Sequence, residues 1–266
     1  MTALTTSHRF APRLRRQLAR VLDRQVYANR CELQDLPHRV FAHRVPLYRP
    51  FPGMGREVAA AKTRNLRRAL ATLDGLVIEP GQAFSFWHLV GAPTLARGFV
   101  LGPDLHQGQL RRHPGGGLCQ ASNLIFWMAA HSPLLILERW RHAYDAFADT
   151  ARTQPFGSGA SLLYNYRDLR LKNHSVQRWQ LRLWLSPNHL HGSLNAEAPL
   201  TEPITVVETD TAIYAHDAGR FTRHNKLWRV QGGQRQLLVE NNALLTYTPR
   251  PHDVAGPKPR AQESTP

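Results

Sequence analysis

The spacing of hydrophobic positions in this 266-residue chain changes from helical in the first half to alternating in the second. Apolar residues recur every three to four positions within 57–73, which predicts an amphipathic helix. The stretch 119–131 contains a continuous apolar run and predicts a helix buried on most sides, ended by Ser132-Pro133. A third helical pattern, with arginines between aliphatic residues, covers 11–28.

The second half of the chain has the pattern of antiparallel strands. Residues 179–185 alternate between apolar and polar side chains, which is typical of a half-buried strand. Turn residues separate further predicted strands at 164–171, 190–194, 204–208, 212–215, 227–230, 237–240 and 243–247. The first half adds shorter strands at 76–78, 84–87 and 134–137, and a hairpin within 98–110.

Helices before strands predict an α+β fold. We expect N-terminal helices, one central buried helix that carries Cys119, and a mainly antiparallel sheet from the C-terminal half. Residues 31–55, rich in proline, predict an irregular connection, and 141–160 predict a long turn-rich loop. The predicted domains are a basic helical segment at 1–34, a main domain at 35–248 with a candidate small β subdomain at 200–248, and a disordered tail at 249–266.

The formal net charge of +15 is unevenly spread, with +6 in the first thirty residues and +9 in the remaining 236. The first thirty residues hold seven arginines and one acidic residue, Asp23. This excess predicts an anionic partner, such as anionic lipid, a cell-wall polymer or nucleic acid. Nucleic acid is the least favoured, because no recognised binding module is present. The helix at 11–28 fits an anionic membrane surface, although its aliphatic stripe favours packing against its own domain.

No stretch has the pattern of a secretory signal or of a membrane span. The two cysteines, Cys31 and Cys119, are too few for a disulfide framework and lack zinc-site spacing. We therefore expect a cytoplasmic protein, peripheral to the inner membrane face if the helix at 11–28 binds lipid. His189 and His191 share one strand face and could chelate a metal, but no third ligand is evident nearby, so we expect neither metal nor cofactor.

The candidate chemistry is centred on Cys119, which follows three glycines at the predicted start of a helix. Unpaired N–H groups and the positive end of the helix dipole favour an anion there, so we expect the thiol to ionise more readily than a free one. The adjacent Gln120 is a candidate oxyanion donor. The alternative is a cysteine that acts only as a small buried hydrophobe.

A nucleophilic thiol needs a base. His131 lies about 18 Å along the same helix and is excluded, whereas His142 follows the strand that returns from that helix. Asp168 or Asp145 could orient its imidazole. We therefore predict a Cys119-His142-Asp168 relay. The residues predicted to bind substrate or an oxyanion are Gly115, Gly116, Gly117, Gln120, Tyr144 and Asp145.

Several motifs in order along the chain resemble the VanW family. They are Gly-Gly-Gly-Leu-Cys-Gln-Ala-Ser-Asn at 115–123, Glu-Arg-Trp-Arg-His-Ala-Tyr-Asp at 138–145, Pro-Phe-Gly-Ser-Gly-Ala at 155–160 and Tyr-Asn-Tyr-Arg-Asp-Leu at 164–169. The resemblance extends over residues 35–248 and includes motifs at 84–91 and 188–192. It implies a bacterial protein linked to the cell envelope and to glycopeptide resistance, with no settled biochemical activity.

Two hypotheses for the function follow. In the first, Cys119 carries out acyl transfer or amide hydrolysis on a peptidoglycan-type peptide, whose carboxylate contacts Arg139, Arg141 or Arg152. In the second, the same pocket binds an anionic envelope ligand without turning it over, because glycine-rich turns and positive charge suit anions. The sequence alone leaves open whether the protein is an enzyme.

Overall fold

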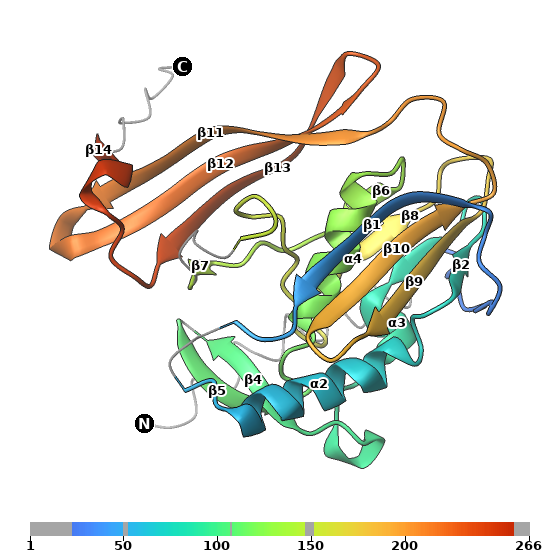
Figure 1. Ribbon diagram of the computed structural model, residues 1–266, viewed down its shortest axis with the longest axis horizontal. Coiled ribbons are helices and arrows are strands. Elements are labelled where there is room, and N and C mark those ends of the chain that lie inside the picture. The colour runs from blue at the N-terminus through green and yellow to red at the C-terminus, as the bar shows by residue number, and fades with distance from the viewer. Residues whose placement is uncertain (1–22, 50–52, 107, 147–151, 258–266) are drawn as a thin grey trace.

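The computed structural model describes residues 23–49, 53–106, 108–146 and 152–257 (Figure 1). Helices and several mostly antiparallel sheets make up an α+β fold, so the predicted fold class is confirmed at this level. Of the predicted helix at 11–28, the part before residue 23 lies outside the described residues. The part from Asp23 onward is not helical, because Tyr27 and Cys31 instead form bridges to strands.

A four-stranded antiparallel sheet packs against the longer helices. Its order is β1 (His38–Pro46), β10 (His189–Ala196), β9 (Trp179–Leu185) and β2 (Leu76–Ile78). The helix α4 (Cys119–Ala130) contacts β10 and β1, and α2 (Arg56–Leu70) contacts β9. Gly192 in β10 permits the close approach of α4, because a Cβ at this position would lie 2.8 Å from the Met128 side chain.

Two smaller groups of strands complete this part of the fold. A three-stranded antiparallel sheet has the order β3 (Ala83–Ser85), β8 (Arg170–Lys172) and β6 (Leu135–Glu138), and α3 (Phe86–Val90) follows β3 directly. After the short 3-10 helix η1 (Leu95–Arg97), the hairpin β4 (Leu101–His106) and β5 (Gln109–Pro114) leads into the glycines before α4.

Three long antiparallel strands extend to one side of the four-stranded sheet (Figure 1). They are β11 (Thr205–His216), β12 (Arg220–Gln231) and β13 (Gln234–Leu245), here called the β-arm, and the 3-10 helix η3 (Asp217–Gly219) lies between the first two. Short strands pair with its edges in parallel: β14 (Val254–Pro257), which follows η4 (Pro251–Asp253), and β7 (Tyr144–Asp145). The boundary of a separate subdomain at residue 200 stays a prediction.

Several sequence predictions are wrong in detail. Residues 38–46 form an edge strand where an irregular connection was predicted, since the prolines flank the strand or end it. The strand predicted at 84–87 becomes helical at Phe86, because Ser85 caps α3. Residues 251–257 of the predicted disordered tail form η4 and β14, whereas residues 258–266 lie outside the described residues.

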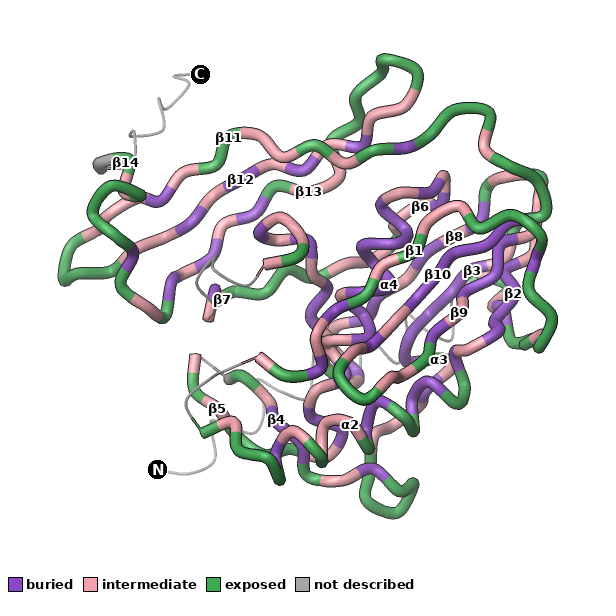
Figure 2. Tube along the Cα trace, viewed as in Figure 1, coloured by how far each residue is buried: buried purple, intermediate pink, exposed green. Residues whose placement is uncertain are grey.

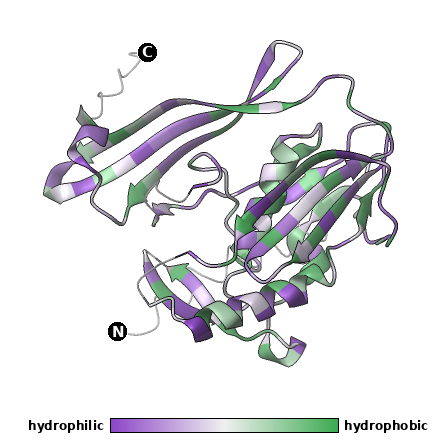
Figure 3. Ribbon diagram, viewed as in Figure 1, coloured by the Kyte–Doolittle hydropathy of each residue, from purple (hydrophilic) through white to green (hydrophobic). Residues whose placement is uncertain are grey.

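The hydrophobic core is built from α4, α2, α3 and the sheets beside them, and the predicted central position of α4 stays a prediction. Nine of the twelve residues of α4 are buried, although Cys119 at its first position is only half-buried. The largest fully buried side chains include Trp179, Phe84 and Phe126. Buried positions gather on α4, β9 and β10, whereas exposed and intermediate positions predominate on the β-arm (Figure 2). Hydrophobic and hydrophilic residues are mixed along the strands of both parts (Figure 3). Burial of apolar surface therefore stabilises the part of the fold around α4, β9 and β10 more than it stabilises the β-arm.

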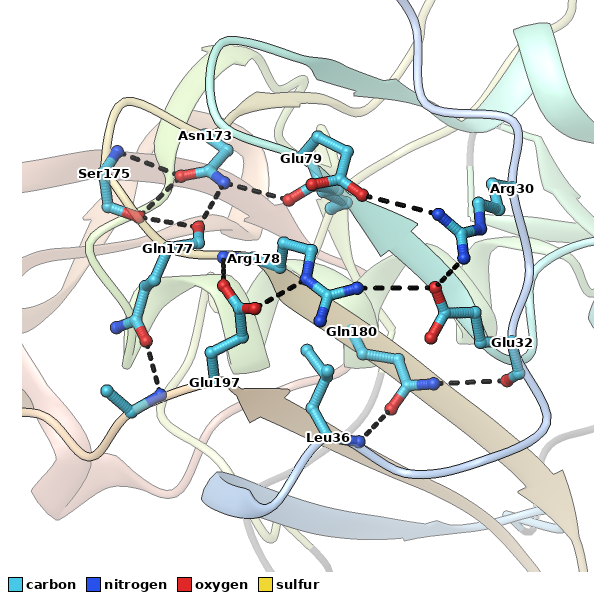
Figure 4. Close-up of polar contacts among 12 residues, drawn as sticks. Arg30, Glu32, Leu36, Glu79, Asn173, Ser175, Gln177, Arg178, Gln180 and Glu197 are labelled. Carbon is cyan, nitrogen blue, oxygen red and sulfur yellow. Dashed lines mark hydrogen bonds and ion pairs between the residues drawn. The ribbon is translucent and has the colours of Figure 1, made fainter.

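A polar network fastens the segment at 30–36 to the four-stranded sheet (Figure 4). Gln180 in β9 is fully buried, and its Oε1 accepts a hydrogen bond from the Leu36 N–H at 2.8 Å. Its Nε2 donates to the carbonyls of Gln34 at 2.9 Å and Glu32 at 3.2 Å. Arg178 pairs with Glu197 at 2.7 Å. One side-chain amide thus satisfies three backbone groups of a segment that has little regular structure of its own.

Replacing Gln180 by methionine tests this role. Gln180→Met keeps the side-chain volume but leaves buried N–H and C=O groups unpaired, so we expect the free energy of unfolding to fall by about 1–3 kcal/mol. Urea denaturation followed by tryptophan fluorescence measures it. Val176→Ala is the control, because the Val176 side chain is 97% exposed. Equal stability of Gln180→Met and the unaltered protein would contradict the assignment.

Candidate functional site

The glycines before α4 form a turn with very close backbone contacts. Gly115 and Gly117 have positive φ angles of 75° and 94°, which favour glycine. Gly116 lies against Gly102 of β4, and a Cβ on Gly116 would lie 2.2 Å from the Gly102 carbonyl oxygen. All three glycines are thus needed for the shape of this turn, whereas their predicted role in binding substrate or an oxyanion stays a prediction. Among them, Gly117 lines the pocket described below.

Asn65 of α2 holds this turn in place. Its side chain is fully buried, and Nδ2 donates to the carbonyl oxygens of Gly116 at 2.9 Å and Val100 at 3.0 Å. Its Oδ1 accepts from the Val100 N–H at 2.8 Å. A buried amide with both of its polar atoms hydrogen-bonded rigidifies what it contacts, so the start of α4 is positioned by α2.

Cys119 is the first residue of α4, and its sulfur lies beside the backbone of Leu162. The Leu162 N–H donates to Sγ at 3.4 Å. Burial is the largest effect on the thiol and raises its pKa to about 11, whereas the Leu162 N–H opposes this rise. The prediction that this thiol ionises more readily than a free one is therefore wrong, because desolvation of the thiolate outweighs the helix N-terminus.

The first N–H groups of α4 are already hydrogen-bonded to the glycine turn. The Gln120 N–H donates to the Gly117 carbonyl at 3.1 Å, and the Ala121 N–H donates to the Leu118 carbonyl at 3.0 Å. The Gln120 side-chain Nε2 donates to the Pro46 carbonyl at 2.6 Å. The donors that the sequence suggested for an oxyanion thus bind backbone oxygens in this structure, which also weakens the attraction of the helix end for an anion.

His142 lines the same pocket, but its hydrogen bond is to Asn123. The ring Nε2 lies 3.1 Å from Asn123 Oδ1. The ring is accessible within a concave wall, yet surrounding protein desolvates it, and this, together with the positive charges of Arg139 and Arg167, lowers its pKa to about 4. His142 is therefore neutral at physiological pH.

In the structure, Cys119, His142 and Asp168 of the predicted relay do not hydrogen-bond to one another. Asp168 is buried and accepts from Ser85 Oγ at 2.6 Å and from the Trp87 N–H at 3.1 Å, so it contributes to the cap of α3. It is not among the described residues that line the pocket. The hydrogen bonds of Cys119 Sγ go to Leu162 and that of the His142 ring goes to Asn123.

Tyr144 and Asp145 form β7 and line the pocket, as does Arg152. Asp145 is 5% exposed, and both of its carboxylate oxygens accept from Arg152 Nη2 at 2.6 Å. Arg223 of β12 lies 3.9 Å from the same carboxylate. The charge of Asp145 is thus compensated within the wall, and the carboxylate connects the loop after residue 152 to the β-arm.

These residues surround a pocket of about 430 Å³, a size suited to a small organic ligand. Its described wall comes from the end of β1 and the segment after it, α2, the β4–β5 hairpin, the glycine turn and first turns of α4, residues within 139–146 and 152–167, and β13. Among the described residues that line it, five are cationic and two are acidic. The cationic residues are Arg49, Lys62, Arg139, Arg152 and Arg167, and the acidic residues are Asp104 and Asp145.

Lys62 is one of the pocket residues that the sequence did not single out. Its stem crosses Gly117, where a Cβ would lie 2.2 Å from Lys62 Cγ, and its Nζ donates to the Leu47 carbonyl. Desolvation, with a contribution from the charge of Arg49, lowers its pKa to about 8. The pattern of α2 predicts Lys62 only as one of several basic residues, so no sequence signal distinguishes it from a solvated lysine.

Arg139 supports the part of the wall that Gly157, Gly159 and Asn241 form. It donates to the carbonyls of Gly157 and of Gly159, the latter at 2.7 Å, and to Asn241 Oδ1 of β13 at 3.2 Å. Burial lowers its pKa to about 10, so it stays charged at neutral pH. Its donors are therefore engaged with the wall, while its positive charge still acts on the pocket.

The histidine pair at 189 and 191 has an ordinary surface environment. His191 stacks on Trp184 with ring centroids 5.2 Å apart, and its Nε2 lies 2.9 Å from Ser186 Oγ. Within the described part of the chain, no group of three or more His, Cys, Asp or Glu residues is arranged to hold a metal ion. The same residues include no helix with the length and apolarity needed to span a membrane.

The pKa of Cys119 gives a direct test of the site. In the Cys31→Ser protein, we expect the rate of alkylation of Cys119 by iodoacetamide to rise about tenfold per pH unit from pH 7 to pH 10, because the thiolate fraction does so below a pKa of about 11. Mass spectrometry of quenched samples measures it. A rate that levels off below pH 8 would contradict the raised pKa.

Comparison with known proteins identifies the family. The family model described as VanW like protein matches residues 61–195, about half of the chain. The Vancomycin B-type resistance protein VanW of Enterococcus faecalis is 29% identical over 235 residues, which cover 86% of this chain and 85% of that protein. The Uncharacterized protein YoaR of Bacillus subtilis is 28% identical over 120 residues, which cover 44% of this chain and 37% of that protein. No solved structure matches. The chain therefore belongs to the VanW-like protein family.

Proposed function

We propose that this protein is a binding protein whose pocket takes an anionic ligand of the cell envelope, with a peptidoglycan-type peptide as the favoured class. The observation that carries this proposal is the excess of positive charge around one pocket. Lys62, Arg49 and Arg167 add to the charge of Arg139, whereas Asp145 is already paired with Arg152. An anion entering this concave wall gains more from these charges than it would on an open surface.

The pocket also has apolar walls, which suit a ligand with small apolar groups beside its charge. The apolar lining residues include Val45, Leu110, Phe156 and Leu162. A carboxylate attached to short hydrocarbon groups matches this combination better than a bare inorganic anion does. A peptide with free carboxyl groups has this composition.

The link to the envelope comes from the relative. The Enterococcus faecalis protein is named for vancomycin B-type resistance. Because this chain aligns with most of that protein, we propose a role in the same context, glycopeptide resistance.

The pH dependence of binding provides the test. Muramyl dipeptide, which carries one free carboxyl group, and poly(glycerol phosphate) are the probes, and isothermal titration calorimetry measures binding. If the charged form of Lys62 contacts the ligand, affinity is full below pH 8 and falls as Lys62 loses its proton, by about tenfold between pH 7 and pH 9.

The Lys62→Met protein should bind both probes weakly at every pH, and its affinity should not fall between pH 7 and pH 9. Lys226→Met is the matched control, since Lys226 lies on β12 and pairs with Asp210 at 2.9 Å, outside the pocket lining. Affinity for both probes that is independent of pH and unchanged in Lys62→Met would contradict the proposal.

Cysteine-dependent acyl transfer or amide hydrolysis is the second candidate, favoured by the presence of Cys119 and His142 in one pocket. In that reaction the Cys119 sulfur would attack an amide carbonyl, the amine would leave with a proton, and water would hydrolyse the thioester. The raised pKa of Cys119 and the hydrogen bond of His142 to Asn123 make binding the better-supported function.

Cys119→Ser distinguishes the two candidates. Binding alone predicts affinity within about twofold of the unaltered protein, because Ser keeps the small polar group beside Leu162. Incubation of the unaltered protein with muramyl dipeptide should then release no new amine detectable by mass spectrometry. Release of an amine that stops in Cys119→Ser would replace the binding proposal by the enzyme hypothesis.

A further inference from the structure

Asn123 determines which nitrogen of His142 carries the proton. The backbone N–H of Ala160 donates to Asn123 Oδ1 at 2.7 Å, and a backbone N–H has no acceptor role. The oxygen of the Asn123 amide therefore faces both Ala160 and His142. Since His142 Nε2 lies 3.1 Å from that oxygen, Nε2 must be the donor in this contact.

The other ring nitrogen is consequently an acceptor. A neutral imidazole has one N–H and one lone pair, so a proton on Nε2 leaves the lone pair on Nδ1. The ring is neutral at pH 7 because of its lowered pKa. His142 Nδ1 is thus a hydrogen-bond acceptor in a wall where most charged side chains are cationic.

The packing of the ring places Nδ1 away from the wall. A Cβ on Gly159 would lie 3.1 Å from His142 Cδ2 and 2.8 Å from Asn123 Oδ1, so the Cδ2–Nε2 edge packs against this wall. Nδ1 lies on the other side of the ring. His142 is exposed and lines the pocket, which leaves this nitrogen available to a ligand N–H.

We propose that the pocket recognises the C-terminal end of a peptide, that is, an N-acyl amino acid with a free carboxylate whose amide N–H donates to His142 Nδ1, with Asn123 as the positioning residue. This inference rests on the proposed function, since the carboxylate needs the cationic side chains around Lys62. It adds the requirement for an N–H donor, which a phosphate polymer does not meet. The apolar lining accommodates small side chains such as methyl groups.

Nuclear magnetic resonance on the full chain with ¹⁵N-labelled histidine tests the tautomer. We expect His142 to show a protonated Nε2 and an unprotonated Nδ1 at pH 7. Asn123→Leu should lose this preference, and Asn123→Asp should keep it while raising the pKa of His142, because a carboxylate favours the imidazolium. Asn188→Asp adds the same charge at an exposed position outside the pocket lining and should leave His142 unchanged. A proton on Nδ1 in the unaltered protein would overturn the proposal.

Ligand binding tests the N–H donor. N-acetyl-alanyl-alanine, used in its better-binding all-L or all-D form, is compared with the ester in which oxygen replaces the amide N–H between the two residues. We expect the ester to bind roughly tenfold more weakly, since one hydrogen bond is lost. In the His142→Phe protein, we expect the affinity for the amide to fall and the affinity for the ester to stay within about twofold of its value for the unaltered protein.

The outcomes separate this inference from the proposed function. Equal binding of amide and ester, or no binding of either while poly(glycerol phosphate) binds in a Lys62-dependent way, overturns the inference and leaves the proposed function standing. Failure of every anionic probe to bind overturns both.

Discussion

The contact between the backbones of Gly102 and Gly116 is the constraint on which the rest of the site depends. Neither residue can carry a Cβ without overlapping a backbone oxygen of the other, at 2.3 and 2.2 Å. The buried amide of Asn65 joins this crossing to α2. Lys62 lies three residues earlier on the same helix face, which brings its stem across the glycine turn. The contact between Gly102 and Gly116 therefore fixes both the start of α4 and the position of the Lys62 side chain in the pocket.

Electrostatics in the pocket is a competition between desolvation and the charges nearby. The thiol of Cys119 sits at a helix start, but burial raises its pKa and the first N–H groups already have backbone partners. Burial and neighbouring arginines keep His142 neutral. Lys62 and Arg139 hold charge at neutral pH although burial lowers their pKa. The result is a wall in which the nucleophile is protonated and the cations are charged, which favours binding an anion over attack by a thiolate.

The sequence predicts the parts of this fold that local pattern determines. Patterns among residues that are neighbours in the chain predict the helices α2 and α4, the strand β9 and the hairpin before the glycines. The strand β1 was missed because its pairing with β10 joins residues about 150 positions apart, and no local period reveals it. The glycine, cysteine and histidine motifs indicate the pocket, whereas Lys62 and Asn123 acquire their roles only from contacts across the fold. The placement of Asp168 at α3, away from His142, likewise depends on tertiary structure.

The pairing of β7 with β13 has a consequence for the site as a whole. Tyr144 and Asp145 line the pocket, and their strand partners are Leu244 and Leu245 at the end of the β-arm. Asn241, also from β13, completes that wall through Arg139. The part of the chain that matches the family model ends at residue 195, before the β-arm begins. A fragment that stops there would keep every described lining residue except Asn241, but it would lose the strand with which β7 pairs, so the β-arm acts on the pocket mainly by holding Tyr144 and Asp145 in its wall.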